Sequence, residues 1–188
     1  MEILEEKLYE LYKLHPKGRY RNKTHFPLEV GTDIYGEVIK LGTDNLINHF
    51  PSYFNPSTVF YDLGSGLGKM VIHIGLQCNI KKSIGIEFSK ERYEASLFLK
   101  EKFTQDTNNI HFINQSYFNS TFSDATVIYI DNTCLNEQNN YKLYNMVPRG
   151  CLFIYKKTIN GIKENEDTNN SLVYRTYNER NIRWIIKK

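Results

Sequence analysis

Residues 58–74 decide the fold: they read Thr-Val-Phe-Tyr-Asp-Leu-Gly-Ser-Gly-Leu-Gly-Lys-Met-Val-Ile-His-Ile. The β-favouring run Val59–Tyr61 precedes three glycines at alternate positions, and an apolar helical pattern begins at Met70. This order predicts a strand, a glycine-rich turn and the start of a helix. Glycine allows positive φ and close approach of a ligand to the backbone. Because a helix N-terminus supplies unpaired N–H groups, the stretch predicts a nucleotide-type binding corner at the carboxyl end of a parallel strand.

The residues around this turn limit which class of ligand it can bind. The spacing is G-x-G-x-G, which differs from the G-x-G-x-x-G of dinucleotide enzymes. Asp62, directly before the turn, would repel a pyrophosphate but suits an ammonium group, such as the methionine end of S-adenosylmethionine (SAM). The next predicted strand, Ser83–Ile86, ends in Glu87, which is placed to bind ribose hydroxyls. A glycine turn alone also fits a plain loop, but the combination predicts SAM as the cofactor and S-adenosyl-L-homocysteine (SAH) as the product.

Length and composition indicate one ordinary globular domain. The chain has 188 residues, a hydrophobic content of 40% and a net charge of +3, so bulk charge does not require a nucleic-acid partner. The three cysteines form no C-x-x-C pair, which argues against a disulfide framework and against a zinc site. No apolar run has transmembrane length, and the N-terminus does not resemble a signal peptide. We therefore expect a soluble cytoplasmic or nuclear protein that is not secreted and has no membrane partner.

The N-terminal region combines an amphipathic helix with a basic stretch. Residues 2–14 carry an apolar stripe at helical spacing, which predicts packing on the domain and leaves a partner-binding helix as the alternative. Residues 13–25 are rich in lysine, arginine and histidine. They are either a solvated loop or an arm that contacts nucleic acid or an acidic protein surface. We accordingly divide the chain into a helix and basic arm, 1–30, and one methyltransferase domain, 31–188.

Strand and helix patterns then alternate along the chain. We expect helices within 38–50, 89–103 and 137–146, strands at 110–113, 126–130 and 151–155, a polar loop over 160–170, and a hairpin with strands 171–177 and 182–186. Alternating strand–helix units followed by a hairpin predict an α/β protein with the Rossmann-like fold of class I methyltransferases. Its sheet would have seven mostly parallel strands, a C-terminal antiparallel hairpin and helices on both faces.

Two strand ends in this fold carry further candidate residues. The strand 126–130 is continuous and apolar, as expected for a central strand buried on both faces, and it ends in Asp131 and Asn132. In this fold that strand end lies beside the transferring methyl group. Gln115–Tyr117 follow another strand and are expected to flank the adenine. Tyr117 is either a stacking partner of the base or an ordinary half-buried tyrosine.

From about Ile34 to Tyr155 the chain resembles the Dot-one family (disruptor of telomeric silencing), the non-SET histone lysine methyltransferases. The resemblance is carried by I-Y-G-E at 34–37, D-L-G-S-G-L-G-K-M-V at 62–71, G-I-E at 85–87, V-I-Y-I-D-N at 127–132 and G-C-L-F-I-Y at 150–155. It implies a cofactor loop at Tyr35, Gly36 and Glu37. It also implies a methionine-binding turn at Asp62, Gly64 and Gly66, a ribose clamp at Glu87, and one member of an Asn-Asn pair beside the methyl group at Asn132.

Together, the residue patterns and the resemblance give one set of site predictions. The predicted catalytic residues are Tyr35, Asp131 and Asn132, and no metal is expected because the sulfonium supplies the electrophile. The predicted cofactor contacts are Tyr35, Gly36, Glu37, Asp62, Leu63, Gly64, Ser65, Gly66, Gly68, Lys69, Glu87, Phe88, Ser116, Tyr117 and Asp131.

The chain departs from the family pattern at several of these positions. The family's Asn-Asn-Phe-x-Phe reads Asp-Asn-Thr-Cys-Leu at 131–135, which alters the aromatic wall of the lysine channel. Lys69 stands where the family usually has a glutamine, and Ser116-Tyr117 stand in place of an Asp-Phe pair. Val38 stands in place of a threonine. We still predict SAM binding despite these changes, whereas the identity of the methyl acceptor depends on them.

The resemblance implies methylation of a protein lysine, with a histone or nucleosome as the partner. Such a lysine must lose its proton, and Asp131 is placed either to accept that proton or to hold the amine. Two alternatives stay open: methylation of RNA or a small molecule, and a non-catalytic SAM-binding accessory subunit. The absence of N-P-P-Y at 131–134 argues against adenine-N6 or glutamine-amide methylation of that type.

Overall fold

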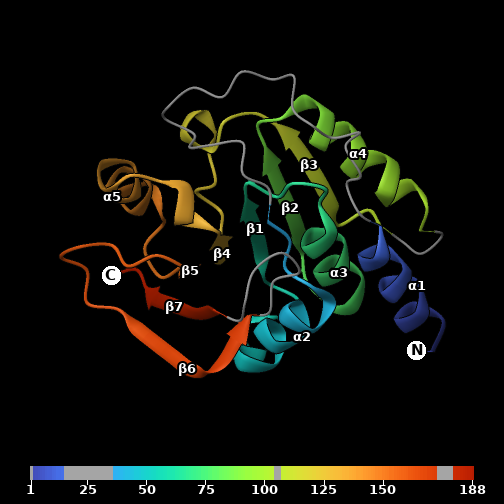
Figure 1. Cartoon of the computed structure of the whole chain (residues 1–188), viewed down its shortest axis with the longest axis horizontal. Helices are drawn as coiled ribbons and strands as arrows, with labels where there is room; N and C mark the ends of the chain where they lie inside the picture. Colours follow the sequence, from blue (N-terminus) through green and yellow to red (C-terminus); the bar gives the residue numbers. More distant parts are fainter. Residues whose placement is uncertain (1, 15–35, 104–106, 173–179) are drawn as a thin grey trace.

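The computed structural model describes residues 2–14, 36–103, 107–172 and 180–188, and it contains one seven-stranded sheet (Figure 1). The strand order is β3-β2-β1-β4-β5-β7-β6. The strands are β1 (Val59–Leu63), β2 (Lys82–Glu87), β3 (Ile110–Asn114), β4 (Val127–Ile130), β5 (Leu152–Tyr155), β6 (Asn165–Leu172) and β7 (Arg180–Ile186). Strands β1 to β5 are parallel, whereas β7 is antiparallel to both β5 and β6. The predicted α/β class, with its mostly parallel sheet and C-terminal hairpin, is confirmed.

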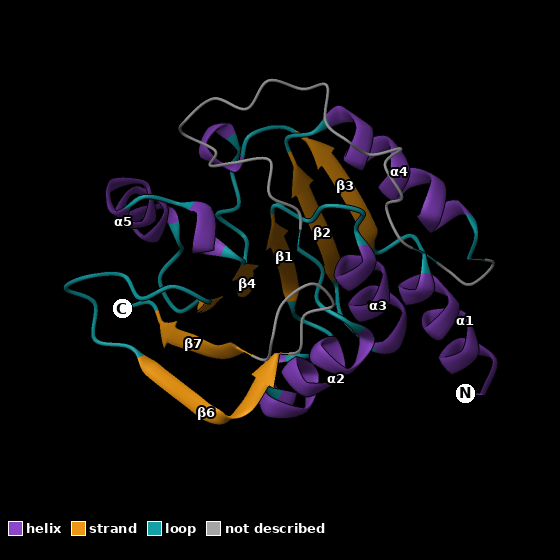
Figure 2. Ribbon diagram, in the orientation of Figure 1, coloured by secondary structure: helices purple, strands orange, loops and turns teal. Residues whose placement is uncertain are grey.

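Helices cover both faces of this sheet (Figure 2). The α-helices are α1 (Glu2–Lys13), α2 (Lys40–His49), α3 (Lys69–Gln77), α4 (Lys90–Glu101) and α5 (Glu137–Met146). On one face, α2 and α3 pack against alternate residues of β1, β4 and β5, such as Phe60 and Val127. On the other face, α5 packs through Leu143 against residues such as Tyr61 and Ile128. Every residue of β1 is buried, because apolar layers cover the strand on both sides.

The N-terminal helix α1 is part of the core. Leu8, Leu11 and Tyr12 are almost fully buried, and they cluster with residues of α3 and α4. The apolar stripe of α1 is therefore occupied by the domain itself. Residues 15–35, which hold nearly all of the basic stretch, lie outside the described ranges. The division of the chain at residues 30 and 31 accordingly stays a proposal.

The C-terminal hairpin begins earlier than predicted. The prediction of a polar loop over 160–170 is wrong from Asn165 onward, because β6 starts there and runs to Leu172. Its first residues pair with β7, Asn165 opposite Trp184 and Asp167 opposite Ile182, before the register shifts. This strand has a sequence that disfavours β structure, so pairing with β7 decides its conformation. Of the predicted strand 171–177, residues 173–177 lie outside the described ranges.

No helix in the described ranges is both long and apolar enough to span a lipid bilayer.

Candidate functional site

The glycine-rich turn joins β1 to α3 as predicted, and its backbone depends on glycine. Gly64, Gly66 and Gly68 have φ angles of 86°, 56° and 74°, a region that other residues rarely adopt. The turn is fixed to the neighbouring strand, because the Gly64 and Ser65 N–H groups donate to the Ile86 carbonyl at 2.8 and 3.1 Å. The chain thus passes rigidly over the carboxyl ends of β1 and β2.

The glycines serve two different purposes. A Cβ on Gly68 would lie 2.4 Å from the Phe112 ring, and one on Gly85 would lie 2.6 Å from the Ser65 hydroxyl oxygen. These two glycines allow helix, turn and sheet to pack closely. A Cβ on Gly64 would meet nothing within 4 Å, so the space on that side of the turn is open. Gly64 is therefore where a ligand can approach the backbone.

Three carboxylates surround this turn at the ends of adjacent strands. Glu87 is 5% exposed; its Oε2 accepts from the Gly66 N–H and its Oε1 from the Ser89 N–H, each at 2.8 Å. Burial raises the pKa of Glu87, although these N–H groups and the nearby Arg92 oppose the shift. Asp131 follows β4 and is exposed, with Oδ1 accepting from the Thr133 N–H at 3.2 Å and from its hydroxyl at 2.7 Å.

Asp62 is the unusual member of the three. It is only 6% exposed, and its carboxylate has no hydrogen bond or ion pair with any residue in the described ranges. Burial, followed by the charges of Glu87 and Asp131, raises the pKa of the Asp62 carboxyl to about 8. A buried acid without a partner is unfavourable in its ionised form, and a cation beside it would remove that penalty. The Ser65 hydroxyl, also buried in the turn, has no hydrogen-bond partner in the described part of the chain.

These observations fit the predicted cofactor. Asp62 and the open side of Gly64 suit the ammonium end of SAM, and the buried Glu87 carboxylate lies one strand away, where the ribose hydroxyls are expected. Leu63, at the end of β1, is buried in the core.

The predicted adenine residues lie at the end of β3. Ser116 is 8% exposed, and its hydroxyl oxygen accepts from the Phe118 N–H at 3.2 Å. Tyr117 is equally buried and packs against Phe118, with ring centroids 4.8 Å apart. Burial raises the Tyr117 pKa far above its ordinary value, so the phenol stays neutral. Phe88 is partly exposed, and its carbonyl accepts from the Asn114 amide at 3.1 Å. Tyr117 is thus more deeply buried than the alternative of an ordinary half-buried tyrosine predicted.

Asn132 has a structural task that the sequence did not indicate. Its side chain is fully buried, and its Nδ2 donates to Asn140 Oδ1 at 2.6 Å and to the Lys157 carbonyl at 2.8 Å. Its Oδ1 accepts from the N–H groups of Lys156 and Lys157 at 2.9 and 2.7 Å. The amide therefore joins the end of β4 to α5 and to the segment after β5, and these four bonds use its whole hydrogen-bonding capacity. Asn132 is placed to position Asp131, and its side chain has no remaining bond for an acceptor.

A cavity of about 400 Å³ lies next to this network, at the carboxyl end of β5. Asn140 and Lys157 belong to the hydrogen-bond network of Asn132 and also line the cavity. The other residues that line the cavity are Glu137, Thr158, Ile159, Asn160 and Arg183. Sequence reasoning missed this cavity, because its residues come from three separate segments and share no motif.

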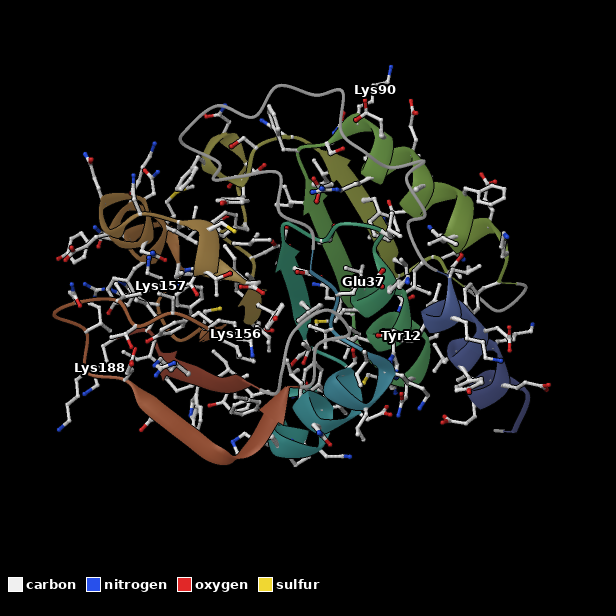
Figure 3. The ribbon with its side chains drawn as sticks, viewed as in Figure 1. Tyr12, Glu37, Lys90, Lys156, Lys157 and Lys188 are labelled. Atoms are coloured by element: carbon white, nitrogen blue, oxygen red, sulfur yellow. The ribbon has the colours of Figure 1, made fainter. Side chains whose placement is uncertain are left out.

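The predicted cofactor loop is described from Gly36 onward, so Tyr35 lies outside the described residues. Gly36 is exposed, whereas the Glu37 side chain is 8% exposed. Glu37 Oε1 forms an ion pair with Lys69 Nζ at 2.6 Å, which holds this segment against the first turn of α3. Glu37 is labelled beside α3 in Figure 3. Lys69 is itself 4% exposed and also donates to the Leu14 carbonyl. Both residues were predicted at the site, but nothing in the sequence indicated that they pair.

Comparison with known proteins identifies the family. The family model for the histone methylation protein DOT1 matches residues 26–183. The chain belongs to this family. A protein-lysine N-methyltransferase of Saccharolobus islandicus is 33% identical over 70 residues, a stretch that covers 37% of this chain and 43% of the relative. The chain thus matches less than half the length of that curated relative.

Solved structures share the fold. An RNA methyltransferase from Salinibacter ruber, solved in complex with SAH, is 18% identical with a TM-score of 0.65, covering 81% of this chain and 94% of that one. A SAM-dependent methyltransferase from Geobacter sulfurreducens, also in complex with SAH, is 18% identical with a TM-score of 0.55 and covers 69% of this chain and 52% of that one. At this level of identity the likeness concerns the fold. The DOT1 match includes the turn and the strand ends that carry the three carboxylates, whereas α1 lies outside it.

Proposed function

We propose that this protein is a SAM-dependent methyltransferase that methylates a lysine side chain of a protein. The observation that carries the proposal is Asp62, a buried carboxylate without a partner in the described ranges, beside the open side of Gly64. Membership of the DOT1 family and the name of the Saccharolobus relative favour a lysine acceptor. The RNA methyltransferase shares only the fold, so it does not favour an RNA acceptor in the same way.

The chain's own residues divide the binding of the cofactor among them. Asp62 pairs with the ammonium group, and the backbone of the turn lies against the methionine portion at the open side of Gly64. Glu87 accepts hydrogen bonds from the ribose hydroxyls, while Gly66 and Ser89 hold its carboxylate in place. Bound SAM supplies an electrophilic methyl group on a sulfonium.

The acceptor amine must be neutral to attack, so its proton needs a destination. Asp131 is the exposed carboxylate at the end of β4, and its position next to the buried Asn132 fixes the backbone from which it extends. We assign Asp131 the role of accepting this proton or of holding the amine. A partly desolvated site assists, because burial lowers the pKa of a lysine. A histone or nucleosome is the protein substrate that we propose to test first.

The test is transfer of a radiolabelled methyl group from SAM by the purified protein. Core histones, nucleosomes, total RNA and a protein lysate are offered separately, and labelled protein is hydrolysed to identify the modified amino acid. Methyl-lysine as the labelled product supports the proposal. Label confined to RNA, or label in another amino acid, contradicts the lysine assignment. Binding of SAH without transfer to any acceptor favours the accessory-subunit alternative, and absence of SAH binding refutes the proposal as a whole.

A further inference from the structure

One buried ammonium group connects the N-terminal helix to the glycine-rich turn. Lys69 is the first residue of α3 and follows Gly68, the last glycine of the turn. Its Nζ lies 2.6 Å from Glu37 Oε1 and also donates to the carbonyl of Leu14, which directly follows α1. Leu14 and Glu37 stand on either side of positions 15–36. Lys69 therefore brings Leu14 and Glu37 to one point, beside the candidate cofactor site.

Burial makes this contact energetically important. The Lys69 and Glu37 side chains are 4% and 8% exposed, so water screens their attraction only weakly. Breaking a buried ion pair by removing one partner is far more damaging than breaking an exposed pair, because a desolvated charge remains. The pair consequently favours one arrangement of Glu37, Leu14 and the first turn of α3.

A second polar contact joins α1 to α3 one helical turn farther from the glycines. The Tyr12 hydroxyl lies 2.8 Å from Thr43 Oγ1 and 3.1 Å from His73 Nδ1. His73 is fully buried, and its Nε2 lies 3.1 Å from Asp44 Oδ1. These hydrogen bonds anchor the same helix without using Glu37 or the turn, although the charges of Glu37 and Asp62 also act on the Tyr12 hydroxyl. The contact therefore provides a matched comparison for Lys69.

We propose that Lys69 is a positioning residue that couples docking of α1 to binding of SAM; this inference rests on the proposed function. The first turn of α3 supplies N–H groups to the site, and Lys69 fixes that turn relative to Glu37 and to the end of α1. A ligand bound at the turn stabilises the arrangement that docks α1, and by linkage a docked α1 raises the affinity for the ligand. The matched family region, residues 26–183, excludes α1, and the resemblance implies a glutamine at position 69.

The experiment compares Lys69→Met with Tyr12→Phe in the full-length protein. SAH affinity is measured by calorimetry, and thermal unfolding is recorded for each variant. We expect SAH affinity to fall about ten-fold or more in Lys69→Met, the range expected for hydrogen bonds that involve a charged group. Tyr12→Phe also loosens α1, but we expect its SAH affinity to stay within about two-fold of the wild type, because its hydrogen bonds lie away from the turn. Equal loss of affinity in the two variants would show that Lys69 acts only through general stability.

Hydrogen exchange gives a readout that does not depend on a variant that folds poorly. In the wild type, SAH must slow amide exchange at the end of α1, over residues 11–14. The same protection must persist in Tyr12→Phe and disappear in Lys69→Gln, which keeps a polar side chain of similar length. Wild-type protein that binds SAH without any protection in α1 overturns the inference but leaves the proposed function standing. Wild-type protein that does not bind SAH overturns both.

Discussion

The buried Asp62 carboxyl predicts that cofactor binding depends on pH in a definite direction. In the ligand-free protein the pKa of Asp62 is raised from 3.8 to about 8, so at neutral pH the group is mostly protonated. Pairing with the ammonium of SAM or SAH favours the ionised form and lowers this pKa again. The complex then holds fewer protons than the free protein, and affinity must rise with pH.

The size of the effect follows from the two ionisation states. Well below the pKa of the free protein, affinity should increase about ten-fold per pH unit, and the increase should level off near pH 8. At still higher pH, where the ligand's own α-amino group loses its proton, affinity should decline again. At pH 7 the binding of one SAH should release almost one proton.

The assay is calorimetric titration with SAH from about pH 6 to pH 9, in pairs of buffers whose ionisation enthalpies differ, so that released protons are counted. Asp62→Asn is the control, because its side chain keeps the shape but cannot ionise. The variant should bind SAH more weakly, and its affinity should be nearly constant from about pH 6 to pH 7. This comparison also separates Asp62 from Glu87, the pKa of which is raised too.

Asp62→Asn should also change the stability of the ligand-free protein, in the direction opposite to its effect on SAH binding. Unfolded Asp62 ionises above about pH 4, whereas the folded group stays neutral until about pH 8, so this group lowers the free energy of unfolding as pH rises through that range. Ligand-free Asp62→Asn should therefore be more stable than the wild type at pH 8, by roughly 1–3 kcal/mol. A wild-type protein whose SAH affinity is independent of pH, or an Asp62→Asn variant with the same pH slope, would refute the reasoning.

Three further substitutions test the other strand ends. Glu87→Ala should weaken SAH binding by about 1.5–3 kcal/mol in calorimetry and leave the fold intact, because a hydrogen bond to a charged group is lost; unchanged affinity would remove Glu87 from the ribose role. Asn132→Leu should lower the free energy of unfolding in urea by about 3 kcal/mol or more, because the buried Lys156 N–H and the partly buried Lys157 N–H lose their acceptor; a loss below about 1 kcal/mol would contradict the network described. Asp131→Asn should reduce turnover about ten-fold or more and leave SAH affinity nearly unchanged, as steady-state kinetics and calorimetry can show; parallel loss of both would assign Asp131 to the cofactor.

Sequence reasoning works well where structure depends on neighbouring residues. The strand, glycine turn and helix start are encoded within residues 58–74, because positive φ at alternate positions requires glycine there. The helix expected within 89–103 forms as α4, and the Ser89 hydroxyl caps it by accepting from the Arg92 N–H at 3.3 Å. The strand β6 was missed, since its polar residues adopt β structure only when β7 lies beside them.

The candidate site likewise contains residues that could be placed from the sequence and contacts that could not. Asp62 and Glu87 could be placed from the sequence, because each directly ends a strand beside the turn. The pairing of Lys69 with Glu37 could not, because the sequence does not specify which buried charges meet. Asn132 lies directly after a strand, as predicted. However, the four groups that hydrogen-bond to its side chain belong to α5 and to the segment after β5. Only the tertiary arrangement reveals that its amide faces inward.

The strand order has a consequence for how the protein is made. β1 carries the turn, but its other neighbour in the sheet is β4, and the Val59 N–H finds its acceptor, the Thr126 hydroxyl, 67 residues later in the chain. A nascent chain that has released β1, α3 and β2 from the ribosome therefore has only one of the two strands that flank β1 in the sheet. Contacts of such large sequence separation are slow to form, because a long loop must close first. The cofactor can thus stabilise the newly made protein only after synthesis has passed β4.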